Sequence, residues 1–236
     1  MKKVLIIVPA YNESEVIVQV VENLISTVTG KNEMIDYVII DDGSIDNTYQ
    51  KCKDNGFNIV SLPVNLGLSS AFRTGMKYAH KNGYDYAIQF DADGQHSADF
   101  INSLVEAAEN NNSDIVIGSR YIFDKRKWSA REIGSRIISF CVWLTTGKKI
   151  YDPTSGMRLY NTKMIKRFAK YTNYYPEPDT VAYLIRCGAK VDECPVQISE
   201  RKAGESYLNF GRSTRYMFNV VTSILLMQWF RRRDMF

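Results

Sequence analysis

The stretch YDYAIQFDADGQH, residues 84–96, joins an apolar run to a cluster of polar side chains. The run is rich in aromatic and aliphatic residues and has a length typical of a buried strand. It ends in two carboxylates, Asp91 and Asp93, which flank the single residue Ala92. Alternate residues of an extended chain point to the same side. The two carboxylates therefore either form a turn, with Ser97 capping the next helix, or share a bound cation.

Similar apolar runs recur along the chain, and stretches with helical periodicity separate them. The expected strands are 4–9, 36–42, 57–62, 84–91, 113–119 and, later in the chain, 189–201. The expected helices are 14–27, 68–83, 98–111, a segment from about residue 46 and, later in the chain, 176–188. Val/Ile-rich strands that alternate with helices predict an α/β fold. Its mostly parallel central sheet should carry helices on both faces. In such sheets, ligands bind at the carboxyl ends of the strands.

Polar clusters follow three of these strands, at what should be one edge of the sheet. They are residues 9–13, 41–44 and 91–93. Each cluster alone is compatible with a local turn, and Ser44 or Asp46 would serve as a helix cap. Three clusters at the same edge favour a binding site. The chain has neither GxGxxG after the first strand nor GxxxxGK[ST], which excludes the usual dinucleotide and P-loop motifs.

The two halves of the chain differ in charge. Residues 1–119 contain 8 Lys/Arg and 16 Asp/Glu, a net charge of −8, whereas residues 120–236 contain 22 and 10, a net charge of +12. This asymmetry indicates an anionic partner for the second half, either a nucleic acid or a membrane surface, although a solvated basic surface would have the same composition. No recognised nucleic-acid-binding motif is present, so we do not expect a nucleic acid.

The second half also contains two long helical patterns, at residues 131–147 and 213–233. The later one carries a polar stripe at helical spacing and predicts a C-terminal amphipathic helical segment. Its apolar face, like that of residues 137–144, would either join the core or lie on a bilayer with arginine anchors. No run reaches the roughly 20 apolar residues of a membrane span. The four cysteines have no ligand-like spacing and are expected as reduced core thiols of a cytosolic protein.

Seven motifs occur in a characteristic order. They are PAYNE (9–13), DDGS (41–44), NLGLSSAFRTG (65–75), DADGQH (91–96), GSR (118–120), SGMRLY (155–160) and RKAGES (201–206). In this order they resemble glycosyltransferase family 2, which has the GT-A nucleotide-sugar fold. More narrowly they resemble the polyprenyl-phosphate sugar transferases of the dolichol-phosphate mannose synthase group. The resemblance covers roughly residues 3–206.

The resemblance implies a nucleotide-sugar and metal site in the first half. A divalent cation, Mg²⁺ or Mn²⁺, would be held by Asp91, Asp93 and Gln95. Such a cation neutralises the charge that develops on a departing diphosphate. The implied nucleotide-binding residues are Pro9, Ala10, Tyr11, Glu13, Asp42, Asp91, Ala92 and Asp93. His96 is compatible with a surface or capping role as well as with a functional one.

The resemblance places the acceptor in the second half. A lipid phosphate needs cations more than a general base, because a phosphate monoester loses its second proton near pH ~6, and arginine offers a bidentate fork. The residues that match the acceptor-phosphate site are Arg120, Arg131, Ser135 and Arg201. The implied catalytic set is Asp91, Asp93, Arg120 and Arg131. Glu177 and Asp179 match a helix where other family members carry a catalytic base, and here they are expected to bind sugar or to be structural.

We therefore expect a metal-dependent, inverting hexosyltransferase. It would transfer one sugar from UDP-glucose or UDP-N-acetylglucosamine to a polyprenyl (undecaprenyl) phosphate, for cell-surface polysaccharide or glycan modification. The alternatives are a GDP-mannose donor, or a sugar-hydroxyl acceptor with Glu177 or Asp179 as base. A nucleotidyltransferase would need a Gly-rich basic loop after the first strand, and PAYNE is not one. The protein would be cytoplasmic and peripheral on the inner face of the cell membrane.

Two units follow from this interpretation. Residues 1–208 would form the GT-A catalytic domain, with a nucleotide-sugar and metal half (1–119) and an acceptor half (120–208). Residues 209–236 would form the amphipathic helix that contacts the membrane, a small membrane-anchoring protein or a second copy of the chain. Tyr207 stands where the family usually has lysine. We also expect the protein to lack the C-terminal membrane spans that many bacterial relatives carry.

Overall fold

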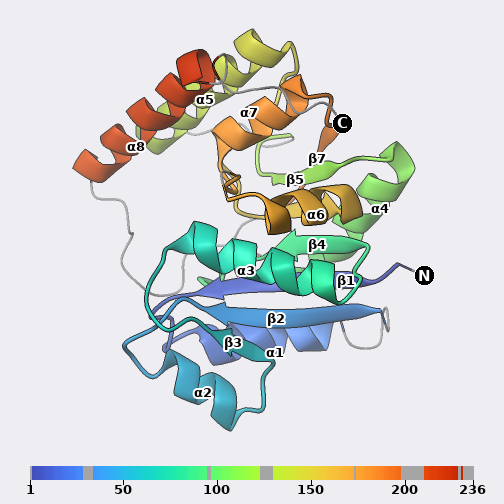
Figure 1. Cartoon of the computed structure of the whole chain (residues 1–236), viewed down its shortest axis with the longest axis vertical. Helices are drawn as coiled ribbons and strands as arrows, with labels where there is room; N and C mark the ends of the chain where they lie inside the picture. Colours follow the sequence, from blue (N-terminus) through green and yellow to red (C-terminus); the bar gives the residue numbers. More distant parts are fainter. Residues whose placement is uncertain are drawn as a thin grey trace.

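The computed structural model describes residues 2–28, 34–94, 97–122, 130–172, 174–197, 210–227 and 230 (Figure 1). The strands are β1 (Val4–Ala10), β2 (Ile35–Asp41), β3 (Ile59–Ser61), β4 (Tyr86–Gln89), β5 (Ile115–Ser119), β6 (Arg158–Asn161) and β7 (Val191–Pro195). The α-helices are α1 (Ile17–Val28), α2 (Thr48–Asp54), α3 (Leu68–Lys81), α4 (Ile101–Asn111), α5 (Ala130–Thr146), α6 (Thr162–Lys170), α7 (Pro178–Arg186) and α8 (Phe210–Thr222). A 3₁₀ turn, η1 (Ala98–Phe100), precedes α4, and a π-helical segment, η2 (Ser223–Met227), continues α8.

The strands form one sheet in the order β3-β2-β1-β4-β6-β5-β7. The expectation of a mostly parallel sheet is confirmed, because within the described residues β6 alone runs antiparallel to its neighbours β4 and β5. The sequence pattern did not predict β6. It has four residues, includes a buried arginine and follows a loop instead of a helix, so it carries no apolar periodicity.

Helices cover both faces of the sheet, as the sequence predicts. One apolar layer lies between the sheet and α3, α5, α6, α7 and α8, and the other between the sheet and α1 and α4, with Cys52 of α2 joining it. Every residue of β1 is buried, as expected for a central strand covered on both sides. Figure 1 shows α3 and α6 in front of the sheet, while α5, α7 and α8 gather at one end.

The C-terminal helix is attached to this same core. α8 packs against α5 and α7, and the buried residues Val220 of α8 and Ile224 of η2 belong to the layer shared with those helices. Phe218 and Leu226 are exposed on other faces of the α8–η2 segment. The predicted unit boundary at residue 208 lies outside the described residues. No helix in the described part of the chain combines the length and apolar character that crossing a bilayer requires. All four cysteines are buried with free thiols.

Candidate active site

The loops that follow β1 and β2 are joined by reciprocal hydrogen bonds. Asn12, in the left-handed region at φ 55°, donates its backbone N–H to Ser44 Oγ at 3.0 Å. Its own Oδ1 accepts the backbone N–H of Ile45 at 3.0 Å. The Asp42 backbone N–H donates to the Ala10 carbonyl at 2.8 Å. Two of the three predicted polar clusters therefore form one surface at the carboxyl edge of the sheet.

Asp42 ties this surface to the loop that begins α3. Its two carboxylate oxygens accept the backbone N–H groups of Leu66 (2.9 Å) and Gly67 (2.7 Å). A carboxylate offers about four acceptor positions, so the predicted role of Asp42 toward a nucleotide stays compatible with this bonding. Gly43 is required for a different reason: a Cβ there would lie 2.5 Å from the backbone carbonyl carbon of Val64, and its φ is +67°. The glycine lets the two loops approach.

The alternative capping roles of Ser44 and Asp46 are resolved by the geometry. Asp46 Oδ1 accepts the Thr48 backbone N–H at 2.9 Å at the start of α2. Burial works to raise the pKa of Asp46, but hydrogen bonds from Thr48 and Ser14 lower it overall. The Ser44 hydroxyl instead accepts the backbone N–H of Asn12. Ser97 accepts the Asp99 N–H and caps η1, as the sequence predicts.

The third cluster contains Asp91 and Asp93, both partly buried just beyond β4. Asp91 Oδ1 accepts a hydrogen bond from Gln89 Nε2 at 3.3 Å. Asp91 Oδ2 lies against Gly156, where an added Cβ would be only 2.0 Å from that oxygen. The glycine of SGMRLY therefore leaves room for the aspartate of DADGQH. Two segments 65 residues apart in sequence meet at this point.

The oxygen ligands offered by this cluster fit a divalent cation of the Mg²⁺ or Mn²⁺ type. Asp91 and Asp93 supply hard oxygen atoms, which such ions prefer. In the described part of the chain, no three His, Cys, Asp or Glu side chains converge on one point. Mg²⁺ is commonly held by one or two carboxylates together with substrate phosphates and water, so a sparse protein contribution suits it. Gln95, the third predicted ligand, lies outside the described residues.

Arg120 and Ser135, both predicted to bind an acceptor phosphate, lie near the same residue, Thr154. Arg120 Nη2 is 3.2 Å from Thr154 Oγ1, and Ser135 Oγ is 3.4 Å from that oxygen. Arg120 also forms a bidentate ion pair with Asp152 through Nε (2.6 Å) and Nη2 (2.7 Å). Burial alone would lower the pKa of Arg120, and its bonds to Asp152 raise it. The side chains of Arg131 and Arg201 lie outside the described residues.

The loop that carries Asp152 and Thr154 is fixed by β7. The two Glu193 carboxylate oxygens accept the backbone N–H groups of Tyr151 and Asp152, each at 2.7 Å. Burial raises the pKa of Glu193, although these two hydrogen bonds act in the opposite direction. The Arg120–Asp152 pair therefore depends on a partly buried carboxylate from another strand.

Glu177 and Asp179 lie at the start of α7, and a buried arginine of β6 acts on Glu177 through its charge. Arg158 is 2% exposed and donates to the carbonyls of Ser155 and Pro153, each at 2.8 Å. Burial raises the pKa of Glu177, which the Tyr216 hydrogen bond and the charge of Arg158 oppose. Tyr216 donates to Glu177, and Ser223 donates to Asp179. The two carboxylates thus contact the C-terminal helix.

Several residues of this site were not singled out from the sequence, among them Asp152, Thr154, Gly156, Arg158, Glu193 and Tyr216. SGMRLY supplied a signal for Gly156 and Arg158, because it is one of the ordered motifs. No local pattern indicates Asp152, Glu193 or Tyr216, whose partners are 32 to 42 residues away in sequence. Pro9 and Ala10 are buried at the end of β1, and Tyr11 and Glu13 are partly buried beyond it.

Comparison with known proteins identifies relatives of this chain. The family model described as Glycosyl transferase family 2 matches residues 5–168. A UDP-N-acetylglucosamine–dolichyl-phosphate N-acetylglucosaminyltransferase of Methanococcus voltae is 33% identical over 186 residues, which cover 70% of this chain and 72% of that protein. An undecaprenyl-phosphate mannosyltransferase of Micrococcus luteus is 27% identical over 239 residues, which cover 96% of each chain.

The fold matches that of a solved GT-A glycosyltransferase. The glucosyl-3-phosphoglycerate synthase of Mycobacterium tuberculosis, crystallised with Mn²⁺, uridine diphosphate and phosphoglyceric acid, superposes with a TM-score of 0.70 at 14% identity. The match covers 95% of this chain and 79% of that one. The predicted GT-A fold is thereby confirmed.

Proposed function

The chain belongs to glycosyl transferase family 2, and from this premise we propose that it transfers one sugar from a nucleotide diphosphate sugar to a polyprenyl phosphate. The names of the two relatives support this acceptor class. They name different sugars, N-acetylglucosamine and mannose. We propose a UDP-linked glucose or N-acetylglucosamine as donor, with GDP-mannose as the alternative, and an undecaprenyl chain as the lipid.

The nucleotide diphosphate would occupy the carboxyl edge of β1, β2 and β4. Pro9, Ala10, Tyr11 and Glu13 would contact the base and ribose together with Asp42, whose carboxylate is fixed by two backbone N–H groups. Asp91 and Asp93, with Gln95, would hold the divalent cation, which supplies positive charge toward the leaving diphosphate. Gln89 and Gly156 keep the Asp91 carboxylate in one position.

The acceptor phosphate would bind near Thr154, with Arg120, Ser135, Arg131 and Arg201. One phosphate oxygen forms a bond to the anomeric carbon while the bond from that carbon to the diphosphate oxygen breaks, and its electron pair leaves with the diphosphate. Attack from the opposite side inverts the configuration. An ionised phosphate needs no base to remove a proton. This suits the engagement of Glu177 and Asp179 by hydroxyl groups of the C-terminal helix.

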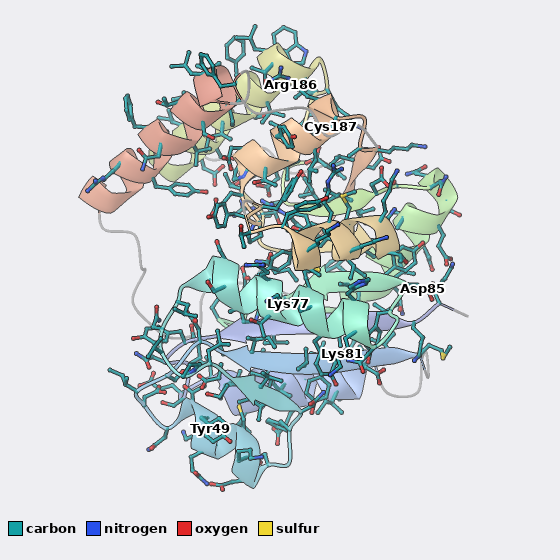
Figure 2. All side chains as sticks on the ribbon, viewed as in Figure 1. Tyr49, Lys77, Lys81, Asp85, Arg186 and Cys187 are labelled. Carbon is teal, nitrogen blue, oxygen red and sulfur yellow. The ribbon has the colours of Figure 1, made fainter. Side chains whose placement is uncertain are left out.

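The outer apolar surface of α5 and α8 supports attachment to a bilayer. On α5 it consists of Ile133, Ile137, Phe140, Trp143 and Leu144, all exposed, and four of them follow helical spacing on one face. Phe218 and Leu226 add exposed side chains from the α8–η2 segment, which packs against α5. Figure 2 shows side chains projecting outward at this end, near Arg186. We propose that this surface lies on the cytoplasmic leaflet, with a membrane-anchoring protein or a second copy as alternative occupants.

The observation that carries the acceptor proposal is the meeting of Arg120 and Ser135 at Thr154, two residues before the Gly156 that lies against Asp91. The test presents a panel of nucleotide sugars with undecaprenyl phosphate, with Mn²⁺ or with EDTA, and reads products by mass. We expect one sugar–phosphate–lipid product, formed only with the cation. A product on a sugar hydroxyl, with none on the lipid phosphate, would contradict the proposal.

A matched pair of serine variants tests the acceptor site itself. Ser135→Ala removes a hydroxyl beside Thr154 and should lower kcat/KM for the lipid phosphate roughly tenfold, the effect of about 1.4 kcal/mol. Ser139→Ala is one turn further along α5, where the hydroxyl donates to the Ile150 carbonyl. Ser139→Ala should leave kcat/KM for the lipid phosphate unchanged. Equal effects of the two variants would remove Ser135 from the acceptor site.

A further inference from the structure

One face of the α8–η2 segment carries two hydroxyl groups between buried apolar side chains. Tyr216, Val220, Ser223 and Ile224 are spaced by four, three and one residues, which places them on one helical face. Val220 and Ile224 are 6% and 0% exposed. The segment is therefore held against the body of the protein at the positions where its hydroxyl groups point inward.

Both hydroxyl groups meet carboxylates at the first turn of α7. Tyr216 Oη donates to Glu177 Oε2, and Ser223 Oγ donates to Asp179 Oδ2 at 2.7 Å. Glu177 occupies the N-cap position of α7, yet its side chain makes no capping hydrogen bond to that helix. Shorter side chains, such as aspartate, are the ones that usually accept an N–H of the first turn from this position. The Glu177 carboxylate is instead directed to another helix.

Glu177 also interacts electrostatically with residues of β6, the strand that follows Gly156. The charge of Arg158 acts on both Glu177 and Tyr216. The neighbouring Tyr160 hydroxyl is affected by Arg158, Glu177 and Asp91. Tyr160 is thus within electrostatic range of both the first turn of α7 and Asp91.

We propose that Tyr216 and Ser223 are positioning residues for sugar transfer, which hold the Glu177 and Asp179 carboxylates in place from the C-terminal helix. This inference rests on the proposed sugar-transferase function. It makes the C-terminal segment part of the active unit, in addition to any contact that its outer face makes. Because a positioned carboxylate accepts hydroxyl groups in a fixed geometry, Glu177 would orient the sugar of the donor.

The experiment compares Tyr216→Phe with Tyr84→Phe in the full chain. Tyr84 is a matched control, because it is a buried tyrosine that donates to a carboxylate, Asp36 Oδ2, at 2.8 Å. That pair lies at the opposite edge of the sheet, at the amino ends of β2 and β4. Each substitution removes one hydroxyl group and keeps the ring. Circular dichroism and thermal unfolding test whether both variants are folded. Ser223→Ala removes the companion hydrogen bond, which ends on Asp179.

Tyr216→Phe should reduce kcat/KM for the donor roughly tenfold, as expected when a reacting group is misplaced. The acid limb of its pH profile should move upward. The titratable and charged groups near Glu177 are Tyr216, Arg158, Asp179 and Tyr160. Tyr216→Phe removes only the Tyr216 hydrogen bond, which lowers the pKa of Glu177. Ser223→Ala should reduce kcat/KM less, and Tyr84→Phe should match the wild type in both readouts.

Wild-type kcat/KM and an unmoved pH profile in Tyr216→Phe would overturn the proposal, since the contact would then serve packing alone. An equal loss in Tyr216→Phe and Tyr84→Phe would overturn it as well. Donor hydrolysis is measured beside transfer, with the acceptor that the wild type uses. If lipid phosphate is not that acceptor, the proposed function fails, while the comparison of the two tyrosines still gives its own answer.

Discussion

Replacement of Gly156 by alanine tests whether the close approach of SGMRLY to Asp91 matters for activity. The new Cβ would lie 2.0 Å from Asp91 Oδ2 and 2.9 Å from Asp91 Cγ. Ordinary contact begins at 3.4 Å, so the carboxylate oxygen has to move by about 1.4 Å, the difference from the required separation. The obstructed atoms belong to the end of a side chain, which can rotate, and not to the backbone.

The expected result is a loss of activity with little loss of stability. A misplacement of about 1 Å in a catalytic constellation costs roughly 100-fold, so Gly156→Ala should lower kcat/KM by about that factor. The apparent affinity for Mn²⁺ should fall with it, because Asp91 is a proposed ligand of the cation. The thermal midpoint should stay within about 4 °C of the wild type, the shift that 1 kcal/mol causes in a chain of this size.

Gly75→Ala is the control, because it introduces similar crowding away from the site. Its Cβ would lie 2.3 Å from Ile7 Cγ2, in the layer between α3 and the sheet. Overpacking of this kind costs about 1–3 kcal/mol, so the control should unfold earlier and keep its activity per folded molecule. Wild-type kcat/KM in Gly156→Ala, or a loss of activity explained entirely by unfolding, would refute the reasoning.

Three further predictions concern the acceptor half, the outer surface and the thiols. Asp152→Asn removes the buried partner of Arg120 and should lower the unfolding free energy by about 3 kcal/mol in urea; a loss below about 1 kcal/mol would show that the pair is dispensable. Phe140→Ser and Trp143→Ser, whose rings are half-exposed, should each weaken binding to anionic vesicles by about 1 kcal/mol in sedimentation, and unchanged binding would exclude this surface. Burial raises the pKa of Cys52 to about 11, so at pH ~8 the native thiols should react with Ellman's reagent only after unfolding.

The sequence predicted the fold because the fold depends on local periodicity. Apolar runs gave β1, β2 and β5 to within two residues, and the helical stripe at 131–147 corresponds to α5 at 130–146. The three polar clusters were expected at one edge because parallel strands end together, and two of them are joined by hydrogen bonds. Strand β6 escaped prediction because a four-residue strand with a buried arginine resembles a loop.

The contacts that complete the site could not be predicted, because they join residues far apart in sequence. Asp152 and Arg120 are 32 residues apart. Their pairing depends on Glu193, which holds the intervening loop from β7. A carboxylate in a loop gives no local sign of such a partner. The ordered motifs show which segments converge, and side-chain geometry is needed to show which atoms meet.

Arg120 and Arg158 do not account for the excess positive charge of the second half. Arg120 is neutralised by Asp152, and its side chain is only 18% exposed. Arg158 donates to backbone carbonyls and lies close to Glu177. A phosphate that approaches Thr154 therefore meets a nearly neutral pair, whose guanidinium offers shape and hydrogen bonds more than net charge. The long-range attraction would then come from other basic residues of this half, such as the four Lys/Arg that the sequence places in 123–131, which include Arg131. Attraction and recognition of the acceptor would then reside in different residues, with salt weakening the first more than the second.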